Sequence, residues 1–385
     1  MRIVYLATGV FDKGGISRYS RYQVRALRDV VGHSQLCVLS ILGPRSNDFE
    51  EPFCVNYHGN GIRLTNKLGF IWATARACLS MQPAIIWCNH VHLLPLGLLV
   101  RCLIPTARLI VNVYGLELWS SRQWLHRRTL KRADVIVSDC HFSANFAVQH
   151  YHIPSQRLRV IWDCVDKNRF YPKRRRDDLL SAFGVPIGPQ YRYVMMLGRI
   201  SVWTRHKGYD RFLDALVTLK EYPDIIALLA GDGNDRPRLE QRVQEEGLTG
   251  RVFFLGDIPE AQLVDVYNLC DVFVLVSDRG HGRGEGIPLT PLEAAACGKP
   301  IIVGNEDGSQ EAVVEGVNGH IVSPRDPRAL REALLDTLMN PDLRDKMGQA
   351  AHARIQAEFS YEGFCEKTAR ILGELQYKKP ERDAS

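Results

Sequence analysis

HGRGEGIPLTPLEAAACGKP, residues 281–300, is the stretch on which the assignment of the fold depends, because it carries two glutamates in an unusual setting. Glu285 and Glu293 stand eight positions apart, with a glycine and two prolines between them. Proline interrupts both a helix and a central strand, so no single element relates the two carboxylates. The sequence therefore predicts that Glu285 lies in a loop and that Glu293 lies in the helix that follows.

The second half of this stretch predicts the start of that helix. Thr290 is a good N-cap, Pro291 suits the first helical position and Glu293 falls at the third, which is the pattern of a capping box. Gly298 is the expected stop. Glu293 thus has a structural explanation about as good as a functional one. Glu285 has none, and an anion held at the helix start would lie between the two carboxylates.

Short aliphatic runs alternate with amphipathic helical patterns on both sides of this stretch. Continuous apolar strands separated by helices are typical of parallel sheets covered on both faces. The runs lie at 2–8, 36–42, 84–88, 109–115, 135–140 and 159–163, and then at 193–199, 225–233, 252–257, 272–277 and 300–304. The sequence predicts an α/β protein with two tandem Rossmann-like doubly wound parallel-sheet domains and a cleft between them.

The length of 385 residues, with 45% hydrophobic and 24% charged residues, is ordinary for a two-domain globular protein. Residues 168–190 are rich in charge, proline and glycine, which favours a boundary there. The expected parts are an N-terminal domain at 1–180 and a C-terminal domain at 181–360. Residues 361–385 are expected to form a helix that packs back towards the N-terminal domain, followed by a frayed tail.

Two features favour a cytoplasmic location. The opening run, MRIVYLATGV, is shorter than a signal-peptide core, and the apolar stretch at 92–105 is interrupted by two prolines and an arginine. The ten cysteines are scattered without a CxxC pair, which argues against a zinc site or a disulfide framework.

The net charge of +6 is divided unevenly. Residues 1–176 carry 25 basic and 10 acidic residues, or +15, whereas residues 177–385 carry 24 and 33, or −9. A basic half predicts an anionic partner: nucleic acid, a phosphorylated acceptor or an acidic lipid surface.

Candidate phosphate ligands follow the first strand of the second half. In open parallel sheets, ligands bind at the carboxyl ends of strands. Arg199 follows a strand there, and a basic loop with Arg205, His206 and Lys207 comes next. Arginine offers a planar fork to phosphate oxygens and lysine a point charge. Arg199 and Lys207 are therefore predicted to bind phosphate, the alternative being two solvated loop cations.

Glycines also follow the strands. Gly14 and Gly15 lie between the first strand and the first helix, where backbone amides approach a ligand closely, although helix geometry alone explains such a pair about as well. Gly231 and Gly233 flank Asp232 after a later strand. They indicate either a plain turn or the wall of a binding cleft.

Taken together, these segments resemble glycosyltransferase family 4, the glycosyl transferases group 1 of the GT-B fold. The residues that carry the resemblance are Gly14-Gly15-Ile16, Gly198-Arg199 with Lys207-Gly208, Gly231-Asp232-Gly233, Glu285 and Glu293 within 285–302, residues 304–322, and FSYEGF at 359–364.

The resemblance implies a retaining, metal-independent transfer from a nucleotide sugar, with no cofactor and with a UDP- or GDP-sugar as co-substrate. It implies that Arg199 and Lys207 hold the donor pyrophosphate, that Glu285 contacts the transferred sugar, and that Glu293 binds the ribose hydroxyls. The implied donor-binding residues are Gly14, Gly15, Gly231, Gly233, Gly286, Ile287, Pro288, Leu289 and Glu293.

The chain departs from the family pattern at three places, one of which is the loop between Arg199 and Lys207, longer than in the commonest pattern. Many relatives have a histidine in the loop matching residues 112–119, where this chain offers Tyr114 and Glu117. His90 and His92 are the other candidates for the acceptor and sugar side. Pro288 stands where a glycine is frequent and removes one amide donor.

The acceptor is expected to be a growing glycan or a lipid-linked acceptor in cell-surface polysaccharide or glycolipid synthesis. The basic segments 120–134 and 173–176 are either a contact with the inner face of an anionic membrane or solvated surface. Alternative reactions are a nucleotide-sugar epimerase and a sugar-phosphate-accepting synthase. A non-catalytic nucleic-acid module is a distant alternative, and no nucleic acid is expected, because no aromatic-interleaved motif accompanies the charge.

Overall fold

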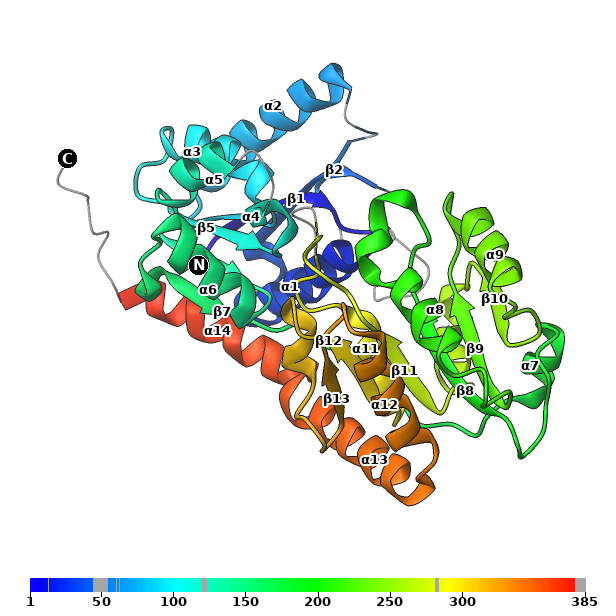
Figure 1. Cartoon of the computed structure of the whole chain (residues 1–385). Helices are drawn as coiled ribbons and strands as arrows, with labels where there is room; N and C mark the ends of the chain where they lie inside the picture. The colour runs from blue at the N-terminus through cyan, green and yellow to red at the C-terminus, as the bar shows by residue number, and fades with distance from the viewer. Residues whose placement is uncertain are drawn as a thin grey trace. The chain divides into compact units, whose positions relative to one another are not determined.

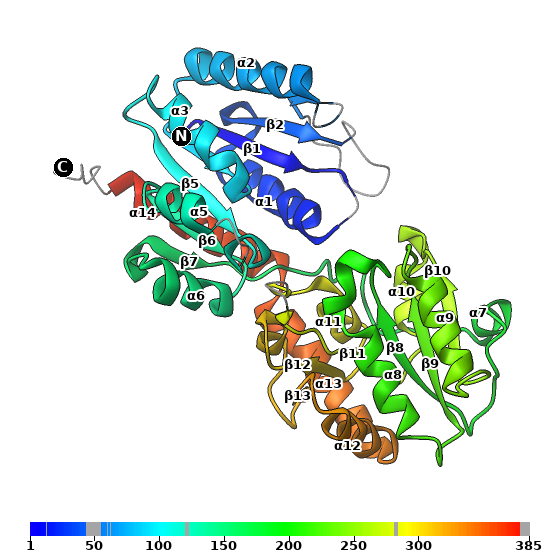
Figure 2. The same cartoon turned by 45° about the horizontal axis from the view of Figure 1, so that its top comes forward.

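The chain is described by a computed structural model that covers residues 1–12, 14–43, 55–59, 61, 63–119, 123–280 and 284–377. It divides into two compact units, both visible in Figures 1 and 2. Unit 1 comprises Met1–Cys164 together with Tyr361–Ser385, and unit 2 comprises Val165–Ser360. Among the described residues no helix is long and apolar enough to cross a membrane.

Unit 1 is built on a parallel sheet of seven strands in the order β3-β2-β1-β4-β5-β6-β7. Its strands are β1 (Ile3–Gly9), β2 (Leu36–Leu42), β3 (Tyr57–His58), β4 (Ile85–Cys88), β5 (Arg108–Val113), β6 (Val135–Ser138) and β7 (Leu158–Val160). Its helices are α1 (Gly15–Val31), α2 (Leu64–Met81), α3 (Leu94–Arg101), α4 (Leu116–Trp119), α5 (Gln123–Leu130), α6 (His141–Tyr151) and α14 (Tyr361–Tyr377), with short 3₁₀ turns at His33–Gln35, Val91–Leu93 and Ser155–Arg157.

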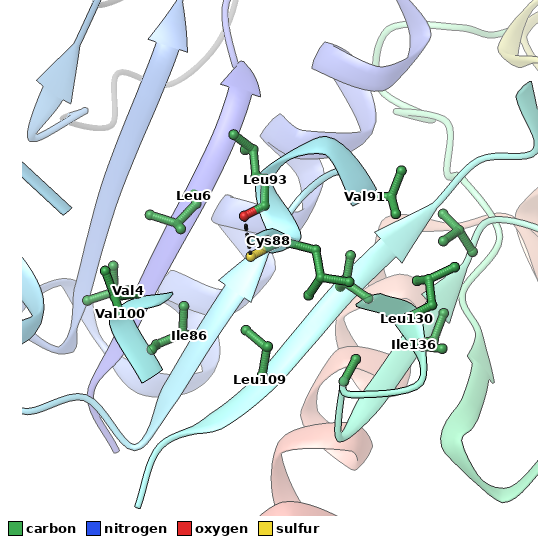
Figure 3. Packing of buried hydrophobic residues seen from close by; sticks show 14 of the residues in the cluster. Val4, Leu6, Ile86, Cys88, Val91, Leu93, Val100, Leu109, Leu130 and Ile136 are labelled. Carbon is green, nitrogen blue, oxygen red and sulfur yellow. Dashed lines mark hydrogen bonds between the residues drawn. The ribbon is translucent and has the colours of Figure 1, made fainter. Parts of the chain in front are cut away.

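The strands of unit 1 bury both of their faces, as continuous apolar runs require. Alternate residues of β1 point to opposite sides, so Val4 and Leu6 join one core while Ile3 and Tyr5 join the other. Figure 3 shows the first of these cores, in which Cys88 of β4 donates through Sγ to the carbonyl of Leu93 at 3.6 Å.

Unit 2 repeats this plan with a parallel sheet of six strands in the order β10-β9-β8-β11-β12-β13. Its strands are β8 (Arg192–Leu197), β9 (Ile225–Ala230), β10 (Val252–Gly256), β11 (Val272–Leu275), β12 (Ile301–Gly304) and β13 (Gly319–Val322). Its helices are α7 (Asp177–Ala182), α8 (Tyr209–Val217), α9 (Arg236–Glu245), α10 (Leu263–Tyr267), α11 (Leu289–Ala296), α12 (Pro327–Leu338) and α13 (Pro341–Glu358), with 3₁₀ turns at Val202–Lys207, Glu260–Gln262 and Gly308–Ala312.

Each sheet reverses its strand order once, between β1 and β4 in unit 1 and between β8 and β11 in unit 2. At such a reversal the connections run to opposite faces and leave a crevice outside the carboxyl ends of the two strands. The two doubly wound parallel sheets predicted from the aliphatic runs are confirmed.

The boundary between the units lies at 164/165 and not at 180/181, where composition placed it. The charged segment after residue 165 is bound to unit 2. Arg169 pairs with Glu260 at 3.0 Å, and Lys173 pairs with Asp265. A stretch rich in charge and proline resembles a linker by composition, but these ion pairs attach it to the following domain.

The C-terminal helix α14 belongs to unit 1. It packs on α1, and its Phe364, Ile371 and Leu372 are buried in the core on that side of the sheet. Phe364 meets the ring of Tyr19 edge-on, with 5.2 Å between the ring centroids. The predicted frayed tail at 378–385 lies outside the described residues.

We expect Phe364→Ala to destabilise unit 1 by about 3–5 kcal/mol, because it removes a buried ring that the core cannot refill. Amide hydrogen exchange followed by peptide mass spectrometry should then rise in unit 1 while unit 2 stays protected. Glu366→Ala, an exposed change on the same helix, is the control and should cost under about 0.5 kcal/mol. Faster exchange confined to unit 2 would contradict the placement of α14.

Candidate functional site

The candidate site of unit 2 lies where β8 and β11 end, at the reversal of strand order. After β8 the chain runs through Gly198 into the 3₁₀ turn Val202–Lys207, which ends at Gly208. Gly208 has φ +97°, and a Cβ there would lie 2.3 Å from the carbonyl oxygen of Val276. Only glycine fits this position, so the turn is pressed against the segment that follows β11. Because Lys207 directly precedes Gly208, the same contact places Lys207 next to that segment.

Lys207 and Glu285, which the sequence predicted to act at one site, are in direct contact. Lys207 Nζ donates to Glu285 Oε1 at 2.6 Å, and both side chains are largely buried. The backbone amide of Glu285 donates to Asp307 Oδ2 at 3.0 Å, and Asp307 is itself buried and bonded to Ser309. The loop before α11 is therefore fixed at both the backbone and the side chain of Glu285.

His206 is a third member of this group. The sequence pattern indicated only that it belongs to the basic loop with Arg205 and Lys207. Its Nε2 lies 3.0 Å from Glu285 Oε1, and because a carboxylate only accepts, Nε2 carries the proton. The ring is buried, and its Nδ1 has no hydrogen-bond partner among the residues that the structure describes. The only signal in the sequence was its position next to Lys207. We refer to Glu285, His206, Lys207 and Asp307 as the Glu285 cluster.

The charge state of the Glu285 cluster follows from these contacts. Burial by itself raises the pKa of Glu285, but the charge of Lys207 and the hydrogen bonds from His206 and Lys207 outweigh it, and the pKa falls to about 2. Burial raises the pKa of Asp307, which the hydrogen bonds from Ser309 partly oppose. Glu285 is therefore a carboxylate at neutral pH, held beside a cation.

The other cations of the loop point elsewhere. Arg205 pairs with Asp235 at 2.5 Å, so it supports the loop and is not part of the cluster. Arg199 is exposed, and within the described residues its side chain forms no ion pair. Its carbonyl accepts from Thr204 at 2.7 Å, which fixes its backbone. The structure thus leaves the Arg199 guanidinium available at the end of β8 but does not bring it to Glu285.

The start of α11 differs from the predicted capping box. The helix begins at Leu289, with Pro288 in the N-cap position and no side-chain cap. Thr290 lies inside the first turn, and within the described part of the chain its hydroxyl has no hydrogen-bond partner. The capping-box prediction is wrong because Pro288, with φ −73° and ψ 139°, already supplies the extended backbone that precedes a helix. Pro288 thereby has a structural role that the family pattern did not explain.

Glu293 lies in the interior of α11 and is buried. Its Oε2 accepts from the hydroxyl of Tyr267 at 2.6 Å. Gly298, with φ +72°, stops the helix as predicted: Gly298 N donates to the carbonyl of Ala295 and Lys299 N to that of Ala294, which is a Schellman motif. Gly286, Ile287, Pro288 and Leu289 are all buried between Glu285 and the helix.

Gly231 and Gly233 have a structural reason to be glycine. Gly231 has φ +121°, and a Cβ there would lie 1.9 Å from the carbonyl oxygen of Gly198. At Gly233, with φ +152°, a Cβ would lie 2.1 Å from that of Ile200. The loops after β8 and β9 pack backbone to backbone at these points, so both glycines have a structural explanation, and their role in donor binding stays a prediction.

In unit 1, Gly14 and Gly15 lie at the start of α1 after β1. Gly14 is the N-cap residue with φ +139°, and the helix has no side-chain cap. A Cβ at either glycine would meet nothing within 4 Å. Packing within unit 1 therefore does not require these glycines, apart from the positive φ of Gly14.

Four residues predicted for the acceptor and sugar side lie at the carboxyl ends of β4 and β5: His90, His92, Tyr114 and Glu117. The ring centroids of His90 and His92 are 4.5 Å apart, and His90 stacks on Tyr114 at 6.1 Å. Burial, reinforced by the nearby His126, lowers the pKa of His90 to about 4, so His90 is neutral at pH 7. Glu117 is buried and accepts from the amide of Tyr114 at 2.6 Å, and burial raises its pKa. His92 is the exposed member.

No metal cluster accompanies either group in the part of the chain that the structure describes, where no three His, Cys, Asp or Glu side chains could share an ion. Of the basic loop at 279–283, His281 and Arg283 lie outside the described residues, as do the side chains of Trp124 and Leu125.

A double-mutant cycle tests the geometry of the Glu285 cluster. Lys207→Met and Glu285→Gln should show a coupling of about 1.5–3 kcal/mol in urea unfolding at pH 7, because each change leaves a buried charge unpaired. Since the pKa of Glu285 is lowered from 4.5 to about 2, the coupling should persist above pH 4.5 and disappear as the pH falls towards 2. The exposed pair Arg325 and Glu306 is the control, with under about 1 kcal/mol expected. Equal couplings for the two pairs would contradict the structure.

Comparison with known proteins places the chain in a family. Residues 182–354 match the family described as Glycosyl transferases group 1, and residues 13–169 match Glycosyltransferase Family 4. The D-inositol 3-phosphate glycosyltransferase of Corynebacterium urealyticum is 31% identical over 272 residues, covering 68% of this chain and 60% of the relative. A GDP-mannose-dependent phosphatidylinositol monomannoside mannosyltransferase of Mycolicibacterium smegmatis is 29% identical over 63% of this chain and 64% of the relative. The chain thus aligns with less than two thirds of the length of these relatives.

Solved structures agree on the fold. Anabaena HepE in complex with UDP superposes with a TM-score of 0.80 at 19% identity, over 97% of this chain and 100% of that one. Sucrose-phosphate synthase of Thermosynechococcus elongatus gives a TM-score of 0.77 at 21% identity, over 98% and 99%. With both family matches lying on the two parallel-sheet units, the chain belongs to glycosyltransferase family 4 and has the GT-B fold.

Proposed function

We propose that the chain is a retaining glycosyltransferase that moves a hexose-type sugar from a nucleotide sugar to an acceptor hydroxyl. The observation that carries the proposal is the contact between Lys207 and Glu285 next to the start of α11, at the reversal of strand order in unit 2. This arrangement puts a cation, a carboxylate and a helix N-terminus at the position where such sheets bind ligands.

The charges fit the departure of a nucleoside diphosphate. Breaking the sugar–phosphate bond leaves negative charge on the pyrophosphate, which Lys207, Arg199 and the amides of Leu289 and Thr290 would stabilise without a metal ion. Pro288 and Pro291 have no amide hydrogen, so they offer no donor there. Removing one such cation should slow transfer by about a hundredfold, or about 3 kcal/mol of barrier.

Glu285 would contact the transferred sugar. Its carboxylate accepts from His206 and Lys207 through Oε1 alone, so Oε2 is the oxygen for a sugar hydroxyl. When the pyrophosphate binds, Lys207 would contact both a phosphate oxygen and Glu285. Glu293 would bind the ribose hydroxyls, and the hydroxyl of Tyr267 donates to its Oε2.

The donor base is proposed to be uracil or guanine. Relatives named as GDP-mannose-dependent favour a GDP-sugar, and the HepE complexes with UDP and UDP-glucose favour a UDP-sugar. A thermal-shift screen with both classes decides this, because a ligand at about 100 times its Kd stabilises the protein by about 2.7 kcal/mol.

The acceptor is proposed to be a glycan or lipid-linked acceptor at the inner face of the membrane, with the enzyme in the cytoplasm. The relatives named for phosphatidylinositol mannoside and lipopolysaccharide core synthesis support this class. The likeness to a mannosylfructose-phosphate synthase keeps a sugar-phosphate acceptor as the second candidate.

The acceptor assay uses radiolabelled donor in three incubations: without acceptor, with lipid-linked acceptors, and with sugar phosphates. The proposal expects label only in the lipid-linked product. Label in an isomerised nucleotide sugar without acceptor would identify an epimerase, and label in a soluble sugar phosphate would identify a synthase. Salt-sensitive RNA binding without donor binding would favour the nucleic-acid alternative.

Lys207→Ala and Glu293→Ala are expected to weaken donor binding at least tenfold in calorimetric titration, because each removes a charged hydrogen-bonding group worth about 1.5–3 kcal/mol. Arg205→Ala is the control from the same loop, since Arg205 is committed to Asp235, and it should bind donor like the wild type. Circular dichroism checks that all three variants are folded. Wild-type affinity in both site variants, for every donor that binds, would refute the assignment.

A further inference from the structure

Helix α2 exposes an apolar stripe on the face turned away from the core. Its inward face is formed by Phe70, Thr74 and Cys78, which are buried against the sheet of unit 1. The outward side chains are related by spacings of three, four and seven residues, which place them on one helix face. They are Leu64, Leu68, Ile71, Trp72 and Leu79, with Leu64 72% and Trp72 64% exposed.

The neighbouring helix α3 extends this surface. It packs beside α2, and Leu99 and Leu103 at its C-terminal end are 60% and 51% exposed. Seven of the fifteen exposed large hydrophobic side chains among the described residues thus lie between residues 64 and 103. A cluster of this kind on the surface of a folded unit indicates an interaction site, because exposed apolar side chains without a function are usually scattered singly. We call these seven side chains the α2 surface.

The charged residues of the segment that carries the α2 surface have one sign. Residues 52–116 contain no Asp or Glu at all. Arg63, Lys67 and Arg76 are exposed on α2. The guanidinium of Arg76 lies 5.4 Å from the centroid of the Trp72 ring, so a cation and an amphipathic aromatic ring stand together at the stripe. Apolar side chains flanked by Lys, Arg and Trp are typical of helices that lie in a membrane interface.

We propose that the α2 surface docks unit 1 on an anionic lipid bilayer. The apolar side chains would enter the boundary between headgroups and acyl chains, and the three cations would meet lipid phosphates. The charge argues against a second copy of the chain as the occupant, because a symmetric contact would bring like cations together. The inference deepens the proposed lipid-linked acceptor and rests on it for its role, but vesicle binding is measured without donor or acceptor.

This surface is not one of the two segments that the sequence singled out. In the segment 173–176, Lys173 pairs with Asp265, and Arg175 and Arg176 pair with Asp177 and Asp178. Those cations are therefore compensated within unit 2. On α2, by contrast, the structure shows no ion pair for Arg63, Lys67 or Arg76 among the described residues, so their charge is available to lipid.

The test is flotation of the full chain with vesicles of phosphatidylcholine and phosphatidylglycerol in equal parts. The wild type should float with these vesicles and not with pure phosphatidylcholine. Leu68→Gln with Trp72→Gln should weaken binding by on the order of a hundredfold, about tenfold for each apolar side chain. Lys67→Gln with Arg76→Gln should weaken it about twenty-five-fold, about fivefold for each cation.

Two matched controls separate the α2 surface from general effects. Val314→Gln with Val317→Gln removes two exposed apolar side chains from unit 2, and Arg174→Gln with Arg175→Gln removes two cations from the other basic segment. Both should float like the wild type, and all variants should bind nucleotide sugar normally. Failure of the wild type to float, equal losses in the controls, or dimerisation abolished by Trp72→Gln would each overturn the proposal. If the wild type does not bind nucleotide sugar, that result would count against the proposed function and not against the α2 surface.

Discussion

The contact of Gly208 with Val276 is the constraint on which the candidate site depends. The two backbones meet so closely that a Cβ at Gly208 would lie 2.3 Å from the Val276 carbonyl oxygen. This contact holds the turn after β8 against the segment after β11, and it carries His206 and Lys207 to Glu285. If the turn after β8 lay farther from the segment after β11, Glu285 would be buried without a cation. That would lower the free energy of unfolding by several kcal/mol.

The charges of the Glu285 cluster neutralise one another within the cluster. Lys207 neutralises Glu285, so a carboxylate is kept ionised in a largely buried position and a lysine is kept pointing into the site. An arriving pyrophosphate would find Lys207 already oriented and the exposed Arg199 at the end of β8, which forms no ion pair with any described residue. Preorganised cations of this kind stabilise developing charge without reorganising during the reaction.

Much of the fold could be predicted from the sequence, because buried parallel strands appear as continuous apolar runs. The exceptions are two short edge strands that form no such run: β3, whose two residues are partly buried, and β13, in which Gly319 and Val322 are buried but the two residues between them are not. The domain boundary was misplaced because composition does not reveal ion pairs such as Arg169 with Glu260. At the site, the assignment of Lys207 and Glu285 to one ligand followed from strand ends and family resemblance, whereas their direct contact and that of His206 depend on the exact path of the turn. The capping box predicted at Thr290 is wrong because Pro288 occupies the N-cap position of α11.

The most direct test of the central claim is a crystal structure of the chain with a bound nucleotide sugar. The account predicts that the pyrophosphate lies at the start of α11, within hydrogen-bonding distance of Lys207 and Arg199, with the sugar against Glu285. The ribose should lie on the Glu293 side. A nucleotide bound elsewhere on the chain, with Lys207 and Glu285 still paired and untouched, would contradict it.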